Sequence, residues 1–254
     1  MFWQSTGYSQ SPVDALLDRD EYTLEELLQE DDVIQETKGM NVRLIGFLKQ
    51  RDNVQQLLQY LVQPAPDPSD NQRQFKYPFA ACEILACEVD AIFTTLVEDD
   101  ELMALLFSLL DTPTNPLDAM LAGYFARVVH SLLTRKSSDT VAYLHRRHAE
   151  LLPKLLRHID TTSIAEVLVC VLGADEHTRV FLPTASLTWL KETNVLDLLL
   201  DRLRPEHPPD VQKAAADVLT AIAETQLSPL AAGLVTTEVR LKPVCITLVV
   251  AATT

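Results

Sequence analysis

Five side chains in two short stretches are the first candidates for chemistry in this chain. His145 and His148 are three residues apart and share a helix face, with His158 further on, but neither HExxH nor CxxC accompanies them. Cys82 and Cys87 are five residues apart, so on a helix they project about 140° from each other and cannot chelate one ion together. We therefore expect solvated histidines on a basic helix face, cysteines in the core, and no metal or other cofactor; a zinc site is the alternative.

Motifs that carry out catalysis are missing from the sequence. It contains no GxxxxGK[ST] or GxGxxG loop to hold phosphates and no GxSxG elbow to present a serine nucleophile. The carboxylates at 98–101 lack the alternating spacing and glycine of a calcium loop, and they suit the N-terminal end of a helix. A Cys–His or Ser–His catalytic pair could form only if the tertiary structure brought the two residues together, and no sequence motif indicates this. We assign no catalytic residue and expect a protein that is not an enzyme.

The elements that position these residues are predicted to be helices. Six glycines and 6 % aromatic residues are too few for a β-sandwich or barrel, and apolar residues recur at helical spacing. About a dozen helices pair at intervals of roughly 40 residues, which is typical of HEAT or armadillo units. The predicted fold is therefore an all-α helical-repeat solenoid. Solenoids of this kind usually bind partner molecules.

Capping signals predict where individual helices begin. Ser11-Pro12 and the box Thr23-x-x-Glu26 open the first two helices. We further expect one long helix from Asp32 to Leu48, one from Pro78 through Ile92, one capped by Asn115-Pro116, two at 139–147 and 149–159, and one at 163–172 with the box Ser163-x-x-Glu166 and Gly173 as terminator.

Composition also limits the partners and the compartment. The net charge of −15 repels nucleic acid. The first ten residues lack the features of a signal peptide, and the uncharged run 243–254 is shorter than the roughly 20 residues of a membrane helix. The four cysteines follow no disulfide pattern. We expect no membrane span, no nucleic-acid partner, and a cytoplasmic protein that also enters the nucleus.

Charge is segregated along the chain. Residues 81–126 hold nine acids and no base, whereas residues 127–158 hold seven bases and two acids. Two interpretations are open: the basic block neutralises the preceding acidic helices internally, or it forms a ridge that docks an acidic partner. Arg146 and Arg147 are adjacent and project about 100° apart on a helix, so at least one should face solvent.

Several stretches closely resemble the SAPS-domain family, the regulatory subunits of protein phosphatase 6 and its fungal counterpart. They are MFW at the start and the segments 16–48, 76–85, 115–129 and 132–144, followed by the pair Trp189-Leu190. The resemblance runs from residue 1 to about 226. We expect residues 1–226 to be the N-terminal part of a SAPS-type repeat domain and 227–254 to be a divergent tail, disordered or poorly packed, of a truncated form.

The resemblance implies a scaffold that binds the catalytic subunit of a protein phosphatase 6-type enzyme, directs it toward substrates, and takes an ankyrin-repeat subunit as a further partner. It favours MFW as an aromatic anchor over a disordered start. The expected partner-binding residues are Phe2, Trp3, Arg135, Lys136, Arg146, Arg147, Lys154 and Arg157. The alternative function is a generic HEAT-type adaptor for protein–protein interaction in transport or signalling, without a phosphatase.

Overall fold

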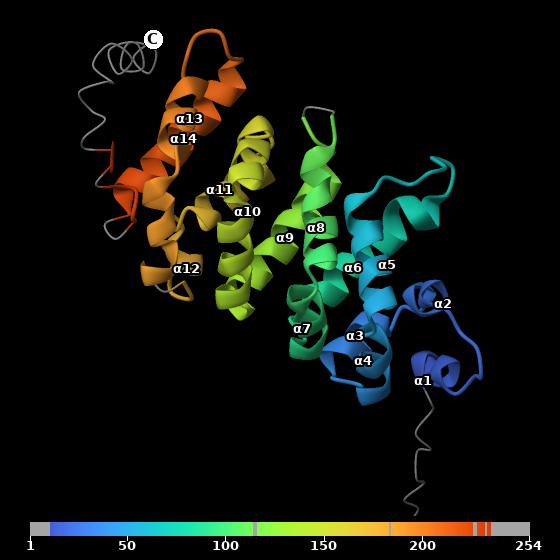
Figure 1. Cartoon of the computed structure of the whole chain (residues 1–254). Helices are drawn as coiled ribbons and strands as arrows, with labels where there is room; N and C mark the ends of the chain where they lie inside the picture. The colour runs from blue at the N-terminus through green and yellow to red at the C-terminus, as the bar shows by residue number, and fades with distance from the viewer. Residues whose placement is uncertain (1–10, 114–115, 183, 226–227, 232, 235–254) are drawn as a thin grey trace, which may run out of the picture.

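The computed structural model describes residues 11–113, 116–182, 184–225, 228–231 and 233–234. Within these ranges the chain forms fourteen α-helices, one π-helical turn and two 3₁₀ segments, and no strand (Figure 1). The predicted all-α helical-repeat solenoid is confirmed. Phe2 and Trp3, and all but a few residues of the segment 227–254 predicted to be a tail, lie outside the described residues.

The first two helices begin where their capping residues predict. In α1 (Pro12–Leu17) the Ser11 hydroxyl accepts a hydrogen bond from the Asp14 amide at 3.0 Å. In α2 (Leu24–Gln29) the Thr23 hydroxyl accepts from the Glu26 amide at 3.2 Å, while the Glu26 carboxylate accepts from the Thr23 amide at 2.9 Å. Both caps are formed by residues close in sequence, so local spacing was sufficient to predict them.

The prediction of one helix from Asp32 to Leu48 is wrong. The segment forms α3 (Val33–Lys38) and α4 (Val42–Leu48), separated at Met40, whose φ of 59° is left-handed. Asn41 then caps α4, accepting from the amides of Arg43 and Leu44 at 3.1 and 3.2 Å. The break allows Val33 and Leu44, both buried, to face the same core from helices of different direction.

The predicted helix from Pro78 to Ile92 also divides. After α5 (Arg51–Val62) and the π-helical turn η1 (Gln72–Lys76), the chain forms α6 (Tyr77–Leu85) and α7 (Asp90–Glu98), with Glu88 at a φ of 56° between them. Asp99 caps α8 (Asp100–Phe107), which continues into the 3₁₀ segment η2 (Ser108–Asp111).

The next two helices are longer, and their boundaries differ from those expected. α9 (Ala119–Arg135) is capped by Asp118 rather than by Asn115, a residue outside the described ranges. The two helices expected between 139 and 159 are one, α10 (Ser137–Arg157), with Pro153 inside it. Leu151, Leu152, Leu155 and Leu156 are all buried around that proline. Their packing offsets the missing amide hydrogen bond.

The last helices complete the described chain. α11 (Thr162–Val171) lacks the expected cap from Ser163 and ends before Gly173, which takes the expected left-handed φ of 65°. It is followed by the short α12 (Glu176–Arg179), which the sequence pattern did not predict, and then by the 3₁₀ segment η3 (Thr184–Glu192), α13 (Val195–Arg202) and α14 (Pro209–Glu224).

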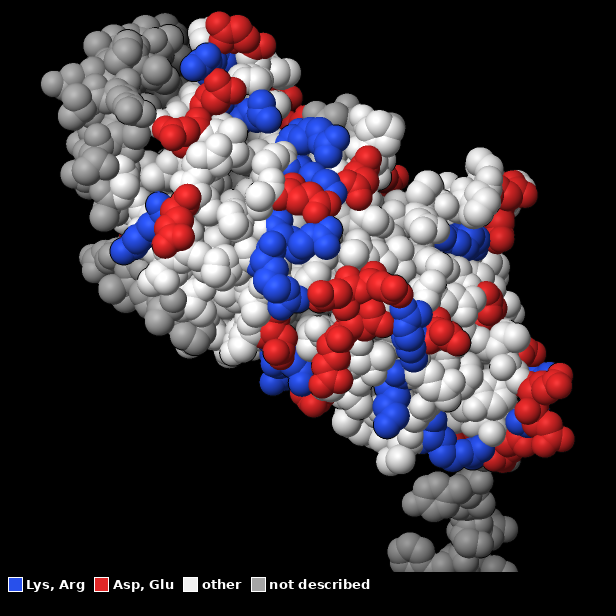
Figure 2. Space-filling view, in the orientation of Figure 1, with Lys and Arg blue, Asp and Glu red and all other residues white. Residues whose placement is uncertain are grey.

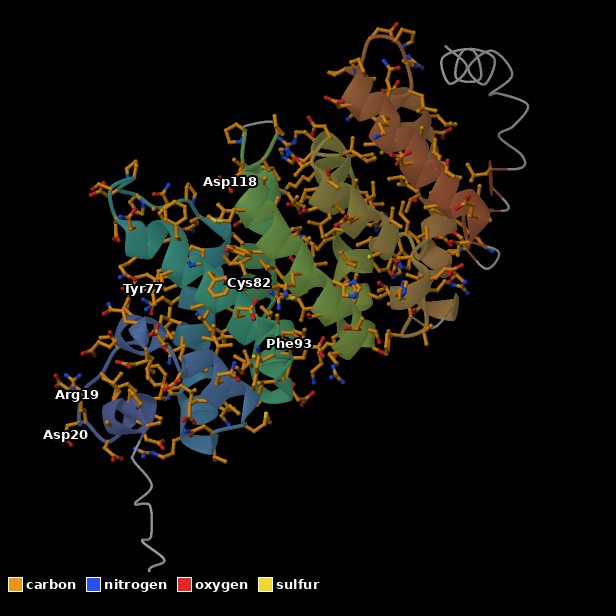
Figure 3. The ribbon with its side chains drawn as sticks, turned by 180° about the vertical axis from the view of Figure 1, so that it is seen from behind. Arg19, Asp20, Tyr77, Cys82, Phe93 and Asp118 are labelled. Atoms are coloured by element: carbon orange, nitrogen blue, oxygen red, sulfur yellow. The ribbon has the colours of Figure 1, made fainter. Side chains whose placement is uncertain are left out.

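The helices alternate between two layers. Layer 1 contains α5, α8, α10 and α13, and layer 2 contains α6, α9, α11 and α14; each layer 2 helix packs on its neighbours in the stack. Figure 3 gives the view from behind, where Tyr77 and Cys82 mark α6 and Asp118 marks the start of α9. The layers meet through buried apolar residues, among them Phe107, whose ring stacks on Tyr143 at 5.7 Å and meets the edge of Phe125 at 5.6 Å.

Candidate partner-binding surface

The basic block of the sequence lies against the acidic helices that precede it. Arg135 pairs with Glu88 at 2.5 Å and Arg146 with Asp100 at 2.7 Å, while Arg127 pairs with Glu83. The partners are 44 to 47 residues apart in the sequence, about one helical repeat. Stacking of successive repeats therefore brings the acids and bases together, and internal neutralisation is observed.

Two lysines of this block are held tightly by their partners. The Lys136 amine lies 2.8 Å from Asp90 and donates to the Thr94 hydroxyl at 2.9 Å; its side chain is 17 % exposed. The Lys154 amine lies 2.5 Å from Asp111 and 2.6 Å from Glu150, and its side chain is 19 % exposed. These lysines connect neighbouring elements, so we interpret both as structural.

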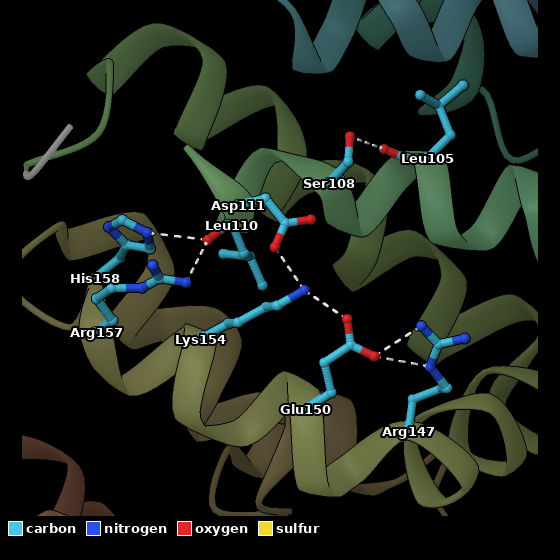
Figure 4. A network of polar contacts seen from close by, with 9 residues as sticks. All are labelled: Leu105, Ser108, Leu110, Asp111, Arg147, Glu150, Lys154, Arg157 and His158. Atoms are coloured by element: carbon cyan, nitrogen blue, oxygen red, sulfur yellow. Dashed lines mark hydrogen bonds and ion pairs between the residues drawn. The ribbon is translucent and has the colours of Figure 1, made fainter. Parts of the chain in front are cut away.

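Figure 4 shows how the Lys154 network continues along α10. Glu150 accepts from Lys154 on one carboxylate oxygen and from the Arg147 guanidinium on the other, at 2.7 and 3.0 Å. Hydrogen bonds from Lys154 and then Arg147 hold the pKa of Glu150 below its usual value. At the end of the helix, Arg157 and His158 both bind the Leu110 carbonyl at 3.2 Å, so these residues and Lys154 tie the last turn of α10 to η2.

Three arginines keep much of their surface in solvent although each has an acidic partner. The side chains of Arg135, Arg146 and Arg147 are 61 %, 56 % and 45 % exposed. Both members of the adjacent pair at 146 and 147 thus reach solvent. Figure 2 shows the basic side chains as a column beside the acidic group across the middle of this face. Exposed ion pairs contribute little to stability, so these arginines can exchange partners at low cost.

The charged residues also connect α8 to α5, the first helix of layer 1. Arg51 of α5 donates to Asp99 at 2.7 Å and pairs with Glu101 at 2.5 Å. The charged residues of α5, α8 and α10 therefore form one row of alternating sign that crosses three helices. We call the exposed Arg146 and Arg147 of this row, together with Arg135 at the end of α9, the arginine surface.

The expectation of solvated histidines holds for His145, which is exposed, but not for His148, which is partly buried, or for His158. The rings of His145 and His148 lie 5.2 and 5.4 Å from the ring of Trp189 in η3, so they cover a largely buried indole. His158 is fully buried. No group of three or more His, Cys, Asp or Glu side chains able to hold a metal ion occurs in the part of the chain that the structure describes.

The three cysteines in the described part of the chain are free thiols in or near the core. Cys82 is buried, whereas Cys87 and Cys170 are partly buried. Cys170 lies 3.9 Å from His130, and its Sγ lies 3.4 Å from the Thr178 hydroxyl, a proximity that sequence spacing could not reveal. Burial raises the pKa of Cys170 to about 11, so the thiol stays protonated at neutral pH and lacks the thiolate of an activated nucleophile.

Layer 2 carries surface features that the sequence analysis did not single out. A groove of about 910 Å³ lies between α11 and α14, with His130 of α9 and the residues around α12 at its end. A shallower groove of about 500 Å³ lies between the start of α6 and α9, where Phe75 and Phe79 are about half exposed. Exposed apolar residues one helical turn apart were the available signal for the second groove.

Within the described ranges, no helix combines the length and the apolar character needed to cross a membrane.

Comparison with known proteins identifies relatives along most of the chain. Residues 129–229 match the SAPS family, described as SIT4 phosphatase-associated protein. The chain is 33 % identical over 222 residues to mouse "Serine/threonine-protein phosphatase 6 regulatory subunit 2" and 34 % identical over 224 residues to subunit 3-B of Xenopus laevis. It is also 33 % identical over 235 residues to "Extragenic suppressor of kinetochore protein 1" of Schizosaccharomyces pombe.

These similarities cover 87 % of this chain but only 24 %, 26 % and 27 % of the three relatives. The chain thus spans about a quarter of the length of the curated relatives it matches. No solved structure matches it.

Proposed function

The chain belongs to the SAPS family of SIT4 phosphatase-associated proteins, and on that premise we propose that it is a regulatory and scaffolding subunit that binds the catalytic subunit of a protein phosphatase 6-type enzyme. The observation that carries this proposal is the identity of about a third, along most of the chain, to proteins named as phosphatase 6 regulatory subunits. A stack of helices with a continuous exposed face suits such a role, because it offers a long rigid surface to another protein.

In this proposal the chain contributes no catalytic group of its own and directs its partner toward phosphoproteins. An ankyrin-repeat subunit is a further proposed partner, and nucleic acid is not. The proposed location is the cytoplasm, and also the nucleus; free thiols at Cys82, Cys87 and Cys170 suit a reducing compartment.

The arginine surface is the proposed docking site for the catalytic subunit. Arg135, Arg146 and Arg147 are exposed and can leave their present partners for carboxylates of an acidic protein. Lys136 and Lys154 are held between helices, so their proposed contribution is to fix the position of that surface. Arg157 has the same supporting role through the Leu110 carbonyl. Phe2 and Trp3 remain proposed contacts.

A binding experiment tests both the partner and the surface. The tagged chain is used to recover proteins from a cell extract, and the recovered metallophosphatase is then measured for association rate at several salt concentrations. Arg146→Glu with Arg147→Glu should slow association at least about tenfold, and the wild-type rate should fall with added salt.

The matched control is Arg19→Glu with Arg204→Glu. These two arginines are also exposed, at 54 % and 66 %, and each forms a surface ion pair. The control changes the net charge by the same amount at the two ends of the stack, so it should leave the association rate close to that of the wild type. Recovery of coat or cargo proteins without a phosphatase would support the adaptor function instead. A rate independent of salt would contradict docking by the arginine surface.

A further inference from the structure

The groove between α11 and α14 has an apolar floor. Val218 and Ile159 are buried, and Ala165, Val169 and Ala214 are partly buried against the core. The groove measures about 910 Å³, which is large for a surface depression of a small helical protein and is enough for several side chains of a peptide.

Each helix contributes one face to this groove. On α11 the lining residues follow the spacing of a single helical face, at positions 162, 165, 166, 169 and 170. On α14 they do the same, at positions 210, 213, 214, 217 and 218. The two faces are parallel stripes of small apolar residues bordered by charged ones, a pattern suited to an elongated ligand lying along both helices.

The border of the groove is acidic, and three of its carboxylates have no basic partner among the described residues. Glu166, Asp210 and Asp217 line the groove and are exposed, and within the described residues none of the three forms an ion pair. Lys213 is the one Lys or Arg among the lining residues. By contrast, the acids of the arginine surface have basic partners from the next repeat. The groove is thus a place where the acidic excess of the chain remains available.

The end of the groove is fixed by a hydrogen-bonded cluster. Asp175 accepts from both the amide and the hydroxyl of Thr178, at 2.6 and 2.5 Å, and that hydroxyl also lies 3.3 Å from the His130 ring. Because these groups satisfy one another, α12 is held against α9 and the groove has a closed, preformed end. A preformed site lowers the entropic cost of binding a peptide.

From these observations we propose that the groove binds a basic amphipathic segment of a partner protein, with apolar side chains on the floor and Lys or Arg side chains on Glu166, Asp210 and Asp217. The charge of the rim selects a cationic segment, and the apolar floor selects an amphipathic one over a purely polar one. The groove is lined by none of Arg135, Arg146 and Arg147, so this inference does not depend on the phosphatase proposal. A scaffold with both sites would hold two different proteins at once.

The test uses a fluorescein-labelled peptide of fourteen residues, LKKLLKLLKKLLKL, and the full chain. We expect its anisotropy to rise with added protein, whereas the same peptide with every lysine replaced by glutamate should not bind. Glu166→Gln with Asp217→Asn keeps the shape of the rim and removes two charges, and should weaken binding at least about fivefold.

Asp52→Asn with Glu206→Gln is the matched control, because both residues are exposed carboxylates outside the groove. It removes the same charge and should leave the affinity unchanged. Ala214→Trp fills the floor and should also weaken binding; circular dichroism establishes that this variant is folded, and if it is not, the Glu166 and Asp217 pair decides alone.

Equal loss of affinity in the Glu166 and Asp217 variant and in the control would overturn the proposal, because the peptide would then respond to the net charge of the protein and not to the groove. The absence of binding to the wild type would overturn it as well, including the case in which residues 235–254 already occupy the groove. Unchanged binding by folded Ala214→Trp would show that the floor is not used and would contradict the amphipathic requirement.

Discussion

The guanidinium of Arg146 on α10 lies 2.7 Å from the carboxylate of Asp100 on α8, across a separation of 46 residues in the sequence. The pair joins two helices of layer 1 that belong to successive repeats. Its two side chains are 56 % and 69 % exposed, whereas Lys154, further along the same helix, is 19 % exposed between its partners. The same row of charges therefore contains pairs with different roles.

Removing the exposed pair should have little effect on stability. For Arg146→Ala we expect the free energy of unfolding to fall by less than about 1 kcal/mol, because water and salt screen both charges. Urea denaturation of Arg146→Ala, Asp100→Ala and the double variant measures the coupling. A coupling energy well above 1 kcal/mol would show that the pair is structural and would weaken the case for the arginine surface.

Removing the lysine between helices should cost more. Lys154→Met keeps the apolar stem but takes the shared cation away from Asp111 and Glu150, and only Glu150 keeps a basic partner, Arg147. We expect a loss of about 1–2 kcal/mol in the free energy of unfolding, reduced at low pH where the carboxylates are protonated. The free energies of unfolding of Lys154→Met and Arg146→Ala are compared under the same conditions. Equal losses would contradict a structural role for Lys154 that Arg146 does not share.

Replacing two glycines by alanine should change the stability in opposite directions. Gly173 has a φ of 65°, and an added Cβ would lie 2.5 Å from a Leu187 methyl, so Gly173→Ala should destabilise the fold by about 1–3 kcal/mol. Gly46 lies within α4, where an added Cβ meets no atom within 4 Å. Gly46→Ala should stabilise by about 0.5–1 kcal/mol. Thermal unfolding of both variants checks the signs, and a stabilised Gly173→Ala would refute the strain argument.

His158 predicts a pH dependence of stability near neutrality. The buried ring lies 3.2 Å from the Leu110 carbonyl, and burial lowers the pKa of His158 in the fold. The unfolded chain takes up a proton near pH 6.5 while the folded chain does so only at lower pH. The unfolded state therefore binds more protons in this window, and stability falls as the pH decreases from about 7 toward 5.

The charged groups that act on this ring are Arg157, which lowers the pKa further, and Asp160, which raises it. His158→Gln keeps a donor for the Leu110 carbonyl but does not titrate, so its stability should decline less over the same pH range. Urea midpoints at pH 5, 6 and 7 give the comparison. Parallel pH profiles for the wild type and His158→Gln would rule out this contribution.

Local sequence was sufficient for several parts of the fold. The caps at Ser11 and Thr23 involve residues three positions away, so their geometry depends on little beyond their own turn. Gly173 was predicted as a helix terminator because glycine takes the left-handed conformation without steric cost, and the structure has it there. The helical period, the spacing of helix pairs and the segregation of acids and bases were also visible in the sequence.

Packing decided the helix boundaries that were predicted wrongly. Met40 and Glu88 adopt a left-handed φ that their side chains disfavour, and they divide two segments that continue a helical pattern. Pro153 should end a helix, yet α10 continues through it because buried leucines surround it. In each case the free energy of burying apolar residues against neighbouring helices exceeds the local preference of the chain.

The sequence by itself determined that this protein is a stack of helices, that it resembles the SAPS family, and that its basic block follows an acidic one. Only the tertiary structure decided which base meets which acid, because those partners come from successive repeats and meet through stacking. It also decided that Glu166, Asp210 and Asp217 border one groove, since α11 and α14 are brought together by packing between repeats. The spacing of residues along the chain shows which of them share the face of one helix. It does not show which two helix faces pack side by side to form a binding surface.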